Sequence, residues 1–71
     1  MERKSVNSSN LASVGYNDLN EILEIEFLNG GIYQYFDVPT SIHKALMNAS
    51  SHGTYFDRYI KKAGYRYKKI R

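Results

Sequence analysis

The chain has 71 residues, a formal net charge of +3 and no cysteine. A chain this short forms a single domain, residues 1–71, and it has neither disulfides nor cysteine-based zinc sites. No apolar run approaches the roughly 20 residues of a membrane span, and the N-terminus lacks the apolar segment of a signal peptide, so we expect a cytoplasmic protein.

The N-terminal third predicts one strand between polar segments. Residues 1–10 are rich in polar side chains and predict a flexible start followed by a turn. Residues 11–16 predict a first strand, in which Gly15 indicates a bulge. Residues 17–20 are a cluster of turn-forming residues that ends this strand.

The clearest strand covers residues 22–28, where apolar side chains alternate with Glu24 and Glu26. This period of two predicts one buried face and one face exposed to water, so the two glutamates are expected to be solvated. A return strand is expected over residues 32–38, with a bend or bulge near Asp37.

The turn between these strands leaves two registers open. A two-residue loop places Phe27 opposite Ile32. A three-residue loop of residues 29–31 places Phe27 opposite Tyr33 and turns Tyr33 and Tyr35 toward the core. The longer loop is preferred because it groups apolar with aromatic side chains, and a slip of one residue exchanges the two faces.

Pro39 ends the return strand because it has no N–H to donate. Thr40 or Ser41 is then expected to cap a helix. The apolar side chains of that helix recur at helical spacing and predict one buried stripe. These side chains are Ile42, Ala45, Leu46 and Ala49.

A second helix is expected after a break at residues 48–53, with Thr54 as its cap. Its predicted inner stripe is Phe56, Tyr59 and Ile60. Gly64 is expected to end it, because glycine accepts the left-handed conformation. Residues 65–70 alternate and predict a possible last strand.

These elements predict an α+β fold in the order β-β-β-α-α-β. A small antiparallel meander of three strands is followed by two short helices and a possible short C-terminal strand.

The same residues resemble a known family, the KTSC domain, named after the C-terminal domain of some lysyl-tRNA synthetases. The resemblance covers about residues 5–67 and centres on Tyr33-x-Tyr35. It also includes Val6, Ser8-Ser9, Leu11, Gly15-Tyr16, Leu23-x-Ile25-x-Phe27-x-Asn29-Gly30, Val38-Pro39, Ser51-x-Gly53, Phe56 and Ile60-Lys61. The resemblance implies stand-alone bacterial and phage-associated relatives, a suggested role in RNA binding, and no catalytic residues. A stacking platform for RNA bases on the sheet is one interpretation of Tyr33 and Tyr35. The preferred register turns both side chains inward, so a structural role in the core is favoured.

Charge is distributed unevenly along the chain, since residues 58–71 contain seven bases and no acid. Lysine and arginine side chains release counterions from phosphates, and tyrosine rings stack on unpaired nucleobases. This is the chemistry of an RNA or single-strand binder. Lys44 extends the surface if the helices present it on the same side. The candidate nucleic-acid-binding residues are Arg58, Lys61, Lys62, Tyr65, Arg66, Tyr67, Lys68 and Lys69. The alternative is that Tyr65 and Tyr67 pack on the sheet while the lysines protect its edge.

A second hypothesis is protein interaction, in which an exposed sheet edge or a tyrosine-rich surface adds to a host protein. Catalysis is not expected, because Ser51 and His52 are merely adjacent and have no orienting acid. His43 is expected to be exposed, and His52 with Asp57 lacks the further ligands of a metal site. We therefore expect no enzyme activity, metal, cofactor, membrane contact or small-molecule substrate.

Overall fold

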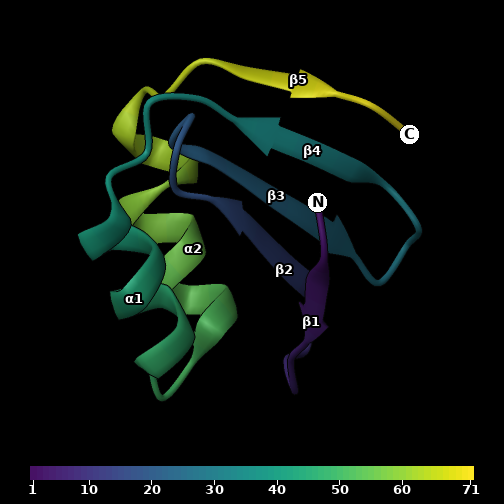
Figure 1. Ribbon diagram of the computed structural model, residues 1–71. Coiled ribbons are helices and arrows are strands. Elements are labelled where there is room, and N and C mark those ends of the chain that lie inside the picture. Colours follow the sequence, from purple (N-terminus) through teal and green to yellow (C-terminus); the bar gives the residue numbers. More distant parts are fainter.

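Five antiparallel strands form one sheet in the computed structural model, which describes residues 1–71. The sheet order is β1-β2-β3-β4-β5, and both helices lie on one side of it (Figure 1). The α+β class and the antiparallel arrangement are confirmed, but four strands rather than three precede the helices. The elements are β1 (Arg3–Ser5), β2 (Leu11–Asn17), β3 (Ile22–Phe27), β4 (Ile32–Tyr35), α1 (Thr40–Asn48), α2 (His52–Tyr59), the 3-10 helix η1 (Lys61–Ala63) and β5 (Tyr67–Lys69).

The expected flexible start is wrong, because residues 3–5 form β1 and pair with β2. Arg3 lies opposite Gly15, and a Cβ at position 15 would lie 2.9 Å from the Glu2 carbonyl oxygen. Gly15 therefore permits the close approach of β1 and does not form a bulge. The register shift of β2 lies instead between Leu11 and Ser13.

The register between β3 and β4 differs from both sequence alternatives. Ile25 lies opposite Tyr33, and Leu23 lies opposite Tyr35. Each tyrosine is two residues away from the partner that the preferred loop predicted. Because a shift of two keeps every side chain on its face, the prediction that both tyrosines turn toward the core is confirmed.

The hairpin loop has three residues, but they are 28–30 rather than 29–31. The Phe27 N–H donates to the Gly31 carbonyl over 2.8 Å, and this bond closes the loop one residue earlier than expected. Gly30 has a φ of 94°, the left-handed conformation that glycine adopts without steric cost. The choice between two adjacent glycines for this position decided the register.

The expected bend near Asp37 is confirmed, since this residue has a φ of 60°. The bend turns Val38 inward, where it is fully buried and donates its N–H to the Glu21 carbonyl over 2.9 Å. The chain then enters α1 through Pro39. No side chain caps this helix, so the expected cap at Thr40 or Ser41 is wrong.

Helix α2 begins at His52, two residues before the expected cap. The Ser51 hydroxyl is the actual cap and accepts the Thr54 N–H over 3.2 Å. Ser51 and Thr54 are both good capping residues, and the earlier one prevails here. The expectation that Gly64 ends the second helix is wrong, because α2 ends at Tyr59 and the separate 3-10 helix η1 follows it. Gly64 ends η1 instead, in the left-handed conformation with a φ of 89°.

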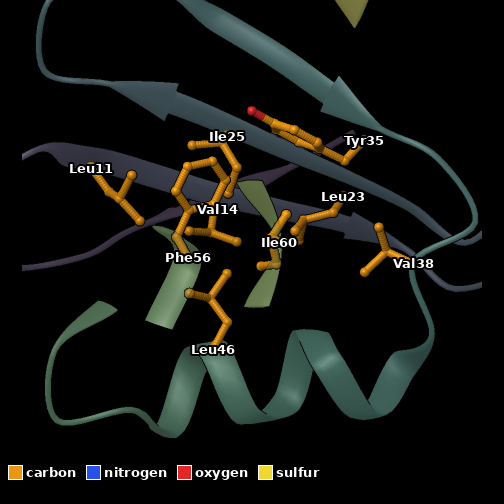
Figure 2. Close-up of a cluster of buried hydrophobic side chains, with 9 residues drawn as sticks. All are labelled: Leu11, Val14, Leu23, Ile25, Tyr35, Val38, Leu46, Phe56 and Ile60. Atoms are coloured by element: carbon orange, nitrogen blue, oxygen red, sulfur yellow. The ribbon is translucent and has the colours of Figure 1, made fainter. Parts of the chain in front are cut away.

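The core lies between the sheet and the two helices (Figure 2). Leu46 from α1 and Phe56 from α2 contribute to the core, together with Ile60, which directly follows α2. Tyr59 does not belong to the inner stripe, because it is 51% exposed and lies against Tyr55. None of the helices has the length and apolar character needed to span a membrane. The core residues are Leu11, Val14, Leu23, Ile25, Tyr35, Val38, Leu46, Phe56 and Ile60.

Candidate nucleic-acid interface

Three tyrosines from neighbouring strands lie together on the helix-covered side of the sheet. Tyr33 and Tyr35 share this face because strand side chains alternate with period two, and β5 places Tyr67 opposite Tyr35. The ring centroids lie 6.5 Å apart for Tyr33 and Tyr35, 5.7 Å for Tyr35 and Tyr67, and 6.1 Å for Tyr33 and Tyr67. The meeting of β4 and β5 therefore produces a continuous aromatic surface.

The aromatic surface lines a cleft of about 450 Å³, which we call the tyrosine cleft. Small-molecule sites in proteins have volumes of roughly 300–1,000 Å³, so a single nucleobase is well within its capacity. The lining residues are Asn10, Phe27, Asn29, Tyr33, Tyr35, Phe56, Asp57, Lys61 and Tyr67.

The depth of each ring in the tyrosine cleft differs. Tyr35 is 6% exposed and belongs to the core, whereas Tyr67 is 64% exposed on the short edge strand. Phe56 meets Tyr35 edge to face, with ring centroids 5.5 Å apart, and holds it from below. The cleft thus has a rigid aromatic floor and one ring that is open to a ligand.

Burial, together with the neighbouring Tyr33 and Tyr67, raises the pKa of Tyr35 to about 12. The unfolded chain ionises this hydroxyl near 10, so the contribution of Tyr35 to stability is complete below that pH. It is lost as the pH rises from 10 to about 12, because the unfolded state releases the proton first. We expect an alkaline titration of tyrosinate absorbance to show a late step that contains one tyrosine fewer in Tyr35→Phe. If the late steps of the unaltered protein and of Tyr35→Phe contain the same number of tyrosines, Tyr35 is solvated.

Two cations adjoin the tyrosine cleft. The Lys69 ammonium lies 6.0 Å from the centroid of the Tyr33 ring, and Lys61 lines the cleft from η1. Neither lysine has an ion-pair partner within 4 Å. Lys68 lies opposite Gln34 and therefore points to the other side of the sheet. Lys68 and Lys69, adjacent in β5, therefore lie on opposite faces of the sheet.

The structure disperses the other predicted site residues. Arg66 pairs with Asp37 over 3.0 Å, and Lys62 pairs with Asp57 over 3.1 Å. Tyr65 is half-buried against the core, which is the alternative that the sequence left open for it. Arg58 lines a neighbouring hollow that shares Asn10 and Asp57 with the tyrosine cleft, and Lys44 lines a hollow that shares no residue with either. Of the eight predicted residues, Lys61, Tyr67 and Lys69 gather at the cleft.

Sequence reasoning missed the polar rim of the cleft. Asn10 comes from the segment before β2, Asn29 from the hairpin loop and Asp57 from α2. The sequence assigned the asparagines to turns and considered Asp57 beside His52, as part of an incomplete metal site. No local pattern links three positions so far apart, so only the assembled fold identifies them as neighbours.

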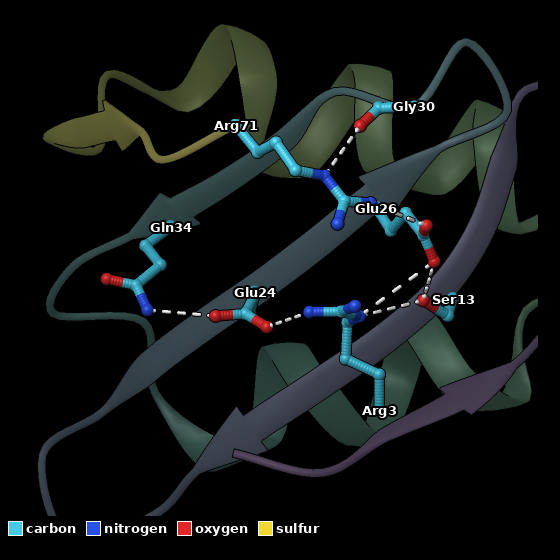
Figure 3. Close-up of polar contacts among 7 residues, drawn as sticks. All are labelled: Arg3, Ser13, Glu24, Glu26, Gly30, Gln34 and Arg71. Atoms are coloured by element: carbon cyan, nitrogen blue, oxygen red, sulfur yellow. Dashed lines mark hydrogen bonds and ion pairs between the residues drawn. The ribbon is translucent and has the colours of Figure 1, made fainter.

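The opposite side of the sheet, here called the open face, holds a polar network (Figure 3). Glu24 forms an ion pair with Arg3 and accepts a hydrogen bond from the Gln34 amide over 2.9 Å. Glu26 accepts a hydrogen bond from the Ser13 hydroxyl over 2.7 Å. The expectation of solvated glutamates is wrong for Glu24, which is 5% exposed, because Arg3 from the unforeseen β1 reaches across the face.

Burial by itself raises the pKa of the Glu24 carboxyl. The hydrogen bonds from Gln34 and Arg3, with the positive charges of Arg3 and the N-terminus, outweigh that effect and hold the pKa below its usual value. Glu24 is thus a charged and fully engaged carboxylate on the side away from the tyrosine cleft. Its charge is compensated locally by Arg3.

Both histidines contact neighbouring residues of the fold. His43 is half-buried and not exposed as expected, because its ring stacks on Tyr16 with centroids 4.5 Å apart. Burial and the charge of Lys4 lower its pKa. His52 directs Nδ1 to the Leu46 carbonyl at 2.8 Å. No group of three or more His, Cys, Asp or Glu side chains is arranged to hold a metal ion.

Comparison with known proteins gives a consistent family. The sequence model described as KTSC domain matches residues 7–69. An uncharacterized protein of Stutzerimonas stutzeri is 41% identical over 99% of both chains. The crystal structure of a KTSC domain protein from Yersinia pestis is 41% identical, with a TM-score of 0.93 over 99% of this chain and 97% of that one. A lysine–tRNA ligase of Nostoc punctiforme is 44% identical over 46 residues, which is 65% of this chain but 8% of the ligase.

Proposed function

The chain belongs to the KTSC domain family, and from that premise we propose that it is a non-enzymatic domain that binds single-stranded RNA through the tyrosine cleft. The observation that carries the proposal is the exposed ring of Tyr67, set beside the buried Tyr35 and the half-buried Tyr33 and flanked by two unpaired lysines. The similar segment in lysine–tRNA ligases favours RNA as the class of partner.

Stacking supplies the first part of the binding. Tyr67 offers a largely exposed aromatic face, and a base stacked on such a face contributes about 1–3 kcal/mol in single-strand binders. Tyr33 and Tyr35 hold the position of Tyr67 through ring contacts at 6.1 and 5.7 Å. A base that enters the cleft therefore meets a preformed surface, and little ordering of the protein opposes binding.

Phosphate contact supplies the second part. Lys61 and Lys69 approach the cleft from η1 and β5, and neither ammonium is neutralised by a carboxylate within 4 Å. Each phosphate that a lysine neutralises releases counterions, so the affinity falls as salt rises. With two such lysines, we expect a shallow slope of log Kd against log salt, of about one to two.

A protein partner is the second candidate, and the outer edge of β5 favours it. Tyr67 and Ile70 are 64% and 44% exposed at this edge, where an added strand finds unpaired backbone groups. A partner strand of this kind contacts backbone and apolar side chains. Its binding is therefore much less sensitive to salt than RNA binding is.

We expect Tyr67→Ala to weaken binding of a short unstructured RNA by about tenfold, the effect of one lost base stack. Lys69→Glu is expected to weaken it by a similar factor, because it reverses a charge beside the cleft. The measurement is fluorescence anisotropy with labelled RNA at about 50 and 200 mM salt.

Lys68→Glu is the matched control, because it makes the same charge change one residue away on the open face. We expect a clearly smaller loss of affinity for this variant at the higher salt, where charges are screened beyond about 8 Å. Equal losses for Lys68→Glu and Lys69→Glu would show that binding follows net charge and not the tyrosine cleft. Unchanged affinity in Tyr67→Ala would remove the stacking surface from the proposal.

A further inference from the structure

We propose that the tyrosine cleft selects guanine, either as a base within a single strand or as a free nucleotide. The inference rests on the proposed function, since it names the base that the cleft accepts. It is carried by the polar groups at the rim, which provide one carboxylate among several hydrogen-bond donors.

Each of the two asparagines at the rim has a side-chain oxygen that already accepts a hydrogen bond within the chain. The Asn29 Oδ1 accepts the Gly31 N–H over 2.9 Å, which fixes the orientation of this amide. The Ser8 hydroxyl oxygen accepts the backbone N–H groups of Asn10 and Leu11, so its proton goes to the Asn10 Oδ1 over 3.1 Å. Both side-chain NH₂ groups are therefore left without a partner in the chain, and each is a donor.

Asp57 is the one acidic residue that lines the cleft. Its Oδ2 pairs with the Lys62 ammonium over 3.1 Å, while its side chain stays 43% exposed and that of Lys62 stays 70% exposed. An exposed pair of this kind is weak, and a carboxylate has lone pairs for further hydrogen bonds. Asp57 thus remains an acceptor with two oxygens side by side. Lys61 adds a cationic donor at the same rim.

Guanine is the base that matches one carboxylate surrounded by donors. Its N1–H and N2 amino group are adjacent donors that suit the two oxygens of Asp57, and its O6 and N7 are acceptors that suit the asparagine amides and Lys61. Adenine and cytosine each place a ring nitrogen lone pair beside their single amino group, and a carboxylate oxygen repels that lone pair. Uracil has one N–H between two carbonyls, with the same effect.

The experiment uses the intact protein and short oligouridine RNAs that carry one central guanosine, adenosine, cytidine, inosine or uridine. We expect the guanosine RNA to bind about tenfold more tightly than the adenosine, cytidine and uridine RNAs, the discrimination typical of a paired base contact. Inosine lacks the N2 amino group and is expected to lose most of that preference. Because this change is in the ligand, it cannot disturb folding of the protein.

Asp57→Asn is expected to reduce the preference for guanosine at least about fivefold and to bring guanosine and inosine to similar affinities. Asp37→Asn is the matched control, because Asp37 is exposed, pairs with Arg66 and does not line the cleft. We expect this control to keep the preference of the unaltered protein.

Guanosine monophosphate is tested as a competitor, and its strength separates the two sources of the base. Competition as strong as that of the guanosine RNA supports a free nucleotide, whereas much weaker competition supports guanine within a strand. RNA binding that is equal for all bases overturns guanine selection and leaves the proposed function intact. Absence of binding to every RNA overturns the proposed function, and guanine selection is overturned with it when guanosine monophosphate also fails to bind in a direct titration.

Discussion

Phe56→Ala is expected to lower the free energy of unfolding by about 3–5 kcal/mol, the usual cost of removing a buried phenylalanine ring. Phe56 is 2% exposed and meets both Phe27 and Tyr35 edge to face, each with centroids 5.5 Å apart. A chain of 71 residues has a total stability of roughly 4–11 kcal/mol, so the loss removes a large part of it. Chemical denaturation followed by circular dichroism measures the change.

Leu19→Ala is the control for this truncation, because Leu19 is an apolar side chain that is 92% exposed. We expect its effect to stay within about 0.5 kcal/mol. Phe56→Ala with the stability of the unaltered protein would mean that α2 does not pack on the sheet. The floor of the tyrosine cleft would then lack its support.

Arg3→Met is expected to destabilise the protein by about 1–3 kcal/mol at neutral pH, the cost of leaving a buried acceptor without its donor. Glu24 is 5% exposed, and after this substitution Gln34 is its remaining hydrogen-bond partner. Methionine keeps much of the apolar stem that covers the open face. The loss therefore reports mainly on the charge and hydrogen bonds of Arg3.

The effect of Arg3→Met depends on pH in a defined direction. In the unaltered protein the pKa of Glu24 is lowered from 4.5, so its contribution to stability is present above that pH and is lost as the pH falls through the folded-state pKa. Burial remains in the variant while the opposing charge is gone, and the pKa of Glu24 rises. The stability difference between the two proteins should therefore shrink as the pH falls below 4.5.

Arg71→Met is the control at the other end of the polar network. Arg71 meets Glu26 over 3.4 Å with a side chain that is 64% exposed, and such surface pairs contribute less than about 1 kcal/mol. Equal effects of Arg3→Met and Arg71→Met would show that Glu24 is hydrated in solution. A stability difference that does not change with pH would lead to the same conclusion.

The candidate site illustrates how far local patterns reach. The seven bases at the C-terminal end indicated a nucleic-acid surface, and Lys61, Tyr67 and Lys69 do meet at the tyrosine cleft. The pattern carried no information on the direction of each side chain. Pairing of β5 with β4 sends Lys68 to the open face, and ion pairs engage Lys62 and Arg66.

The fold shows a similar division between local and distant information. Period-two alternation placed β3 on the chain, because that signal depends on neighbouring residues. Gly64 indicated a helix end, but no local signal showed that α2 ends at Tyr59 and that η1 follows. The bend at Asp37 followed from the change of face between the strand and Val38. The position of the hairpin loop was predicted wrongly, because Gly30 and Gly31 are equally suited to the left-handed conformation and no local signal chooses between them.

From its sequence alone, the chain determined an α+β domain with tyrosines on the core face of a hairpin, because alternation and turn chemistry act over a few residues. Tertiary structure decided the rest. Pairing with β2 ordered β1, because the missing side chain of Gly15 leaves room for the backbone of the N-terminal segment. Tertiary structure also buried Glu24 beneath Arg3, and it gathered Asn10, Asn29 and Asp57 around the tyrosines. These contacts join residues far apart in the chain, and they form only when the whole sheet and both helices pack together.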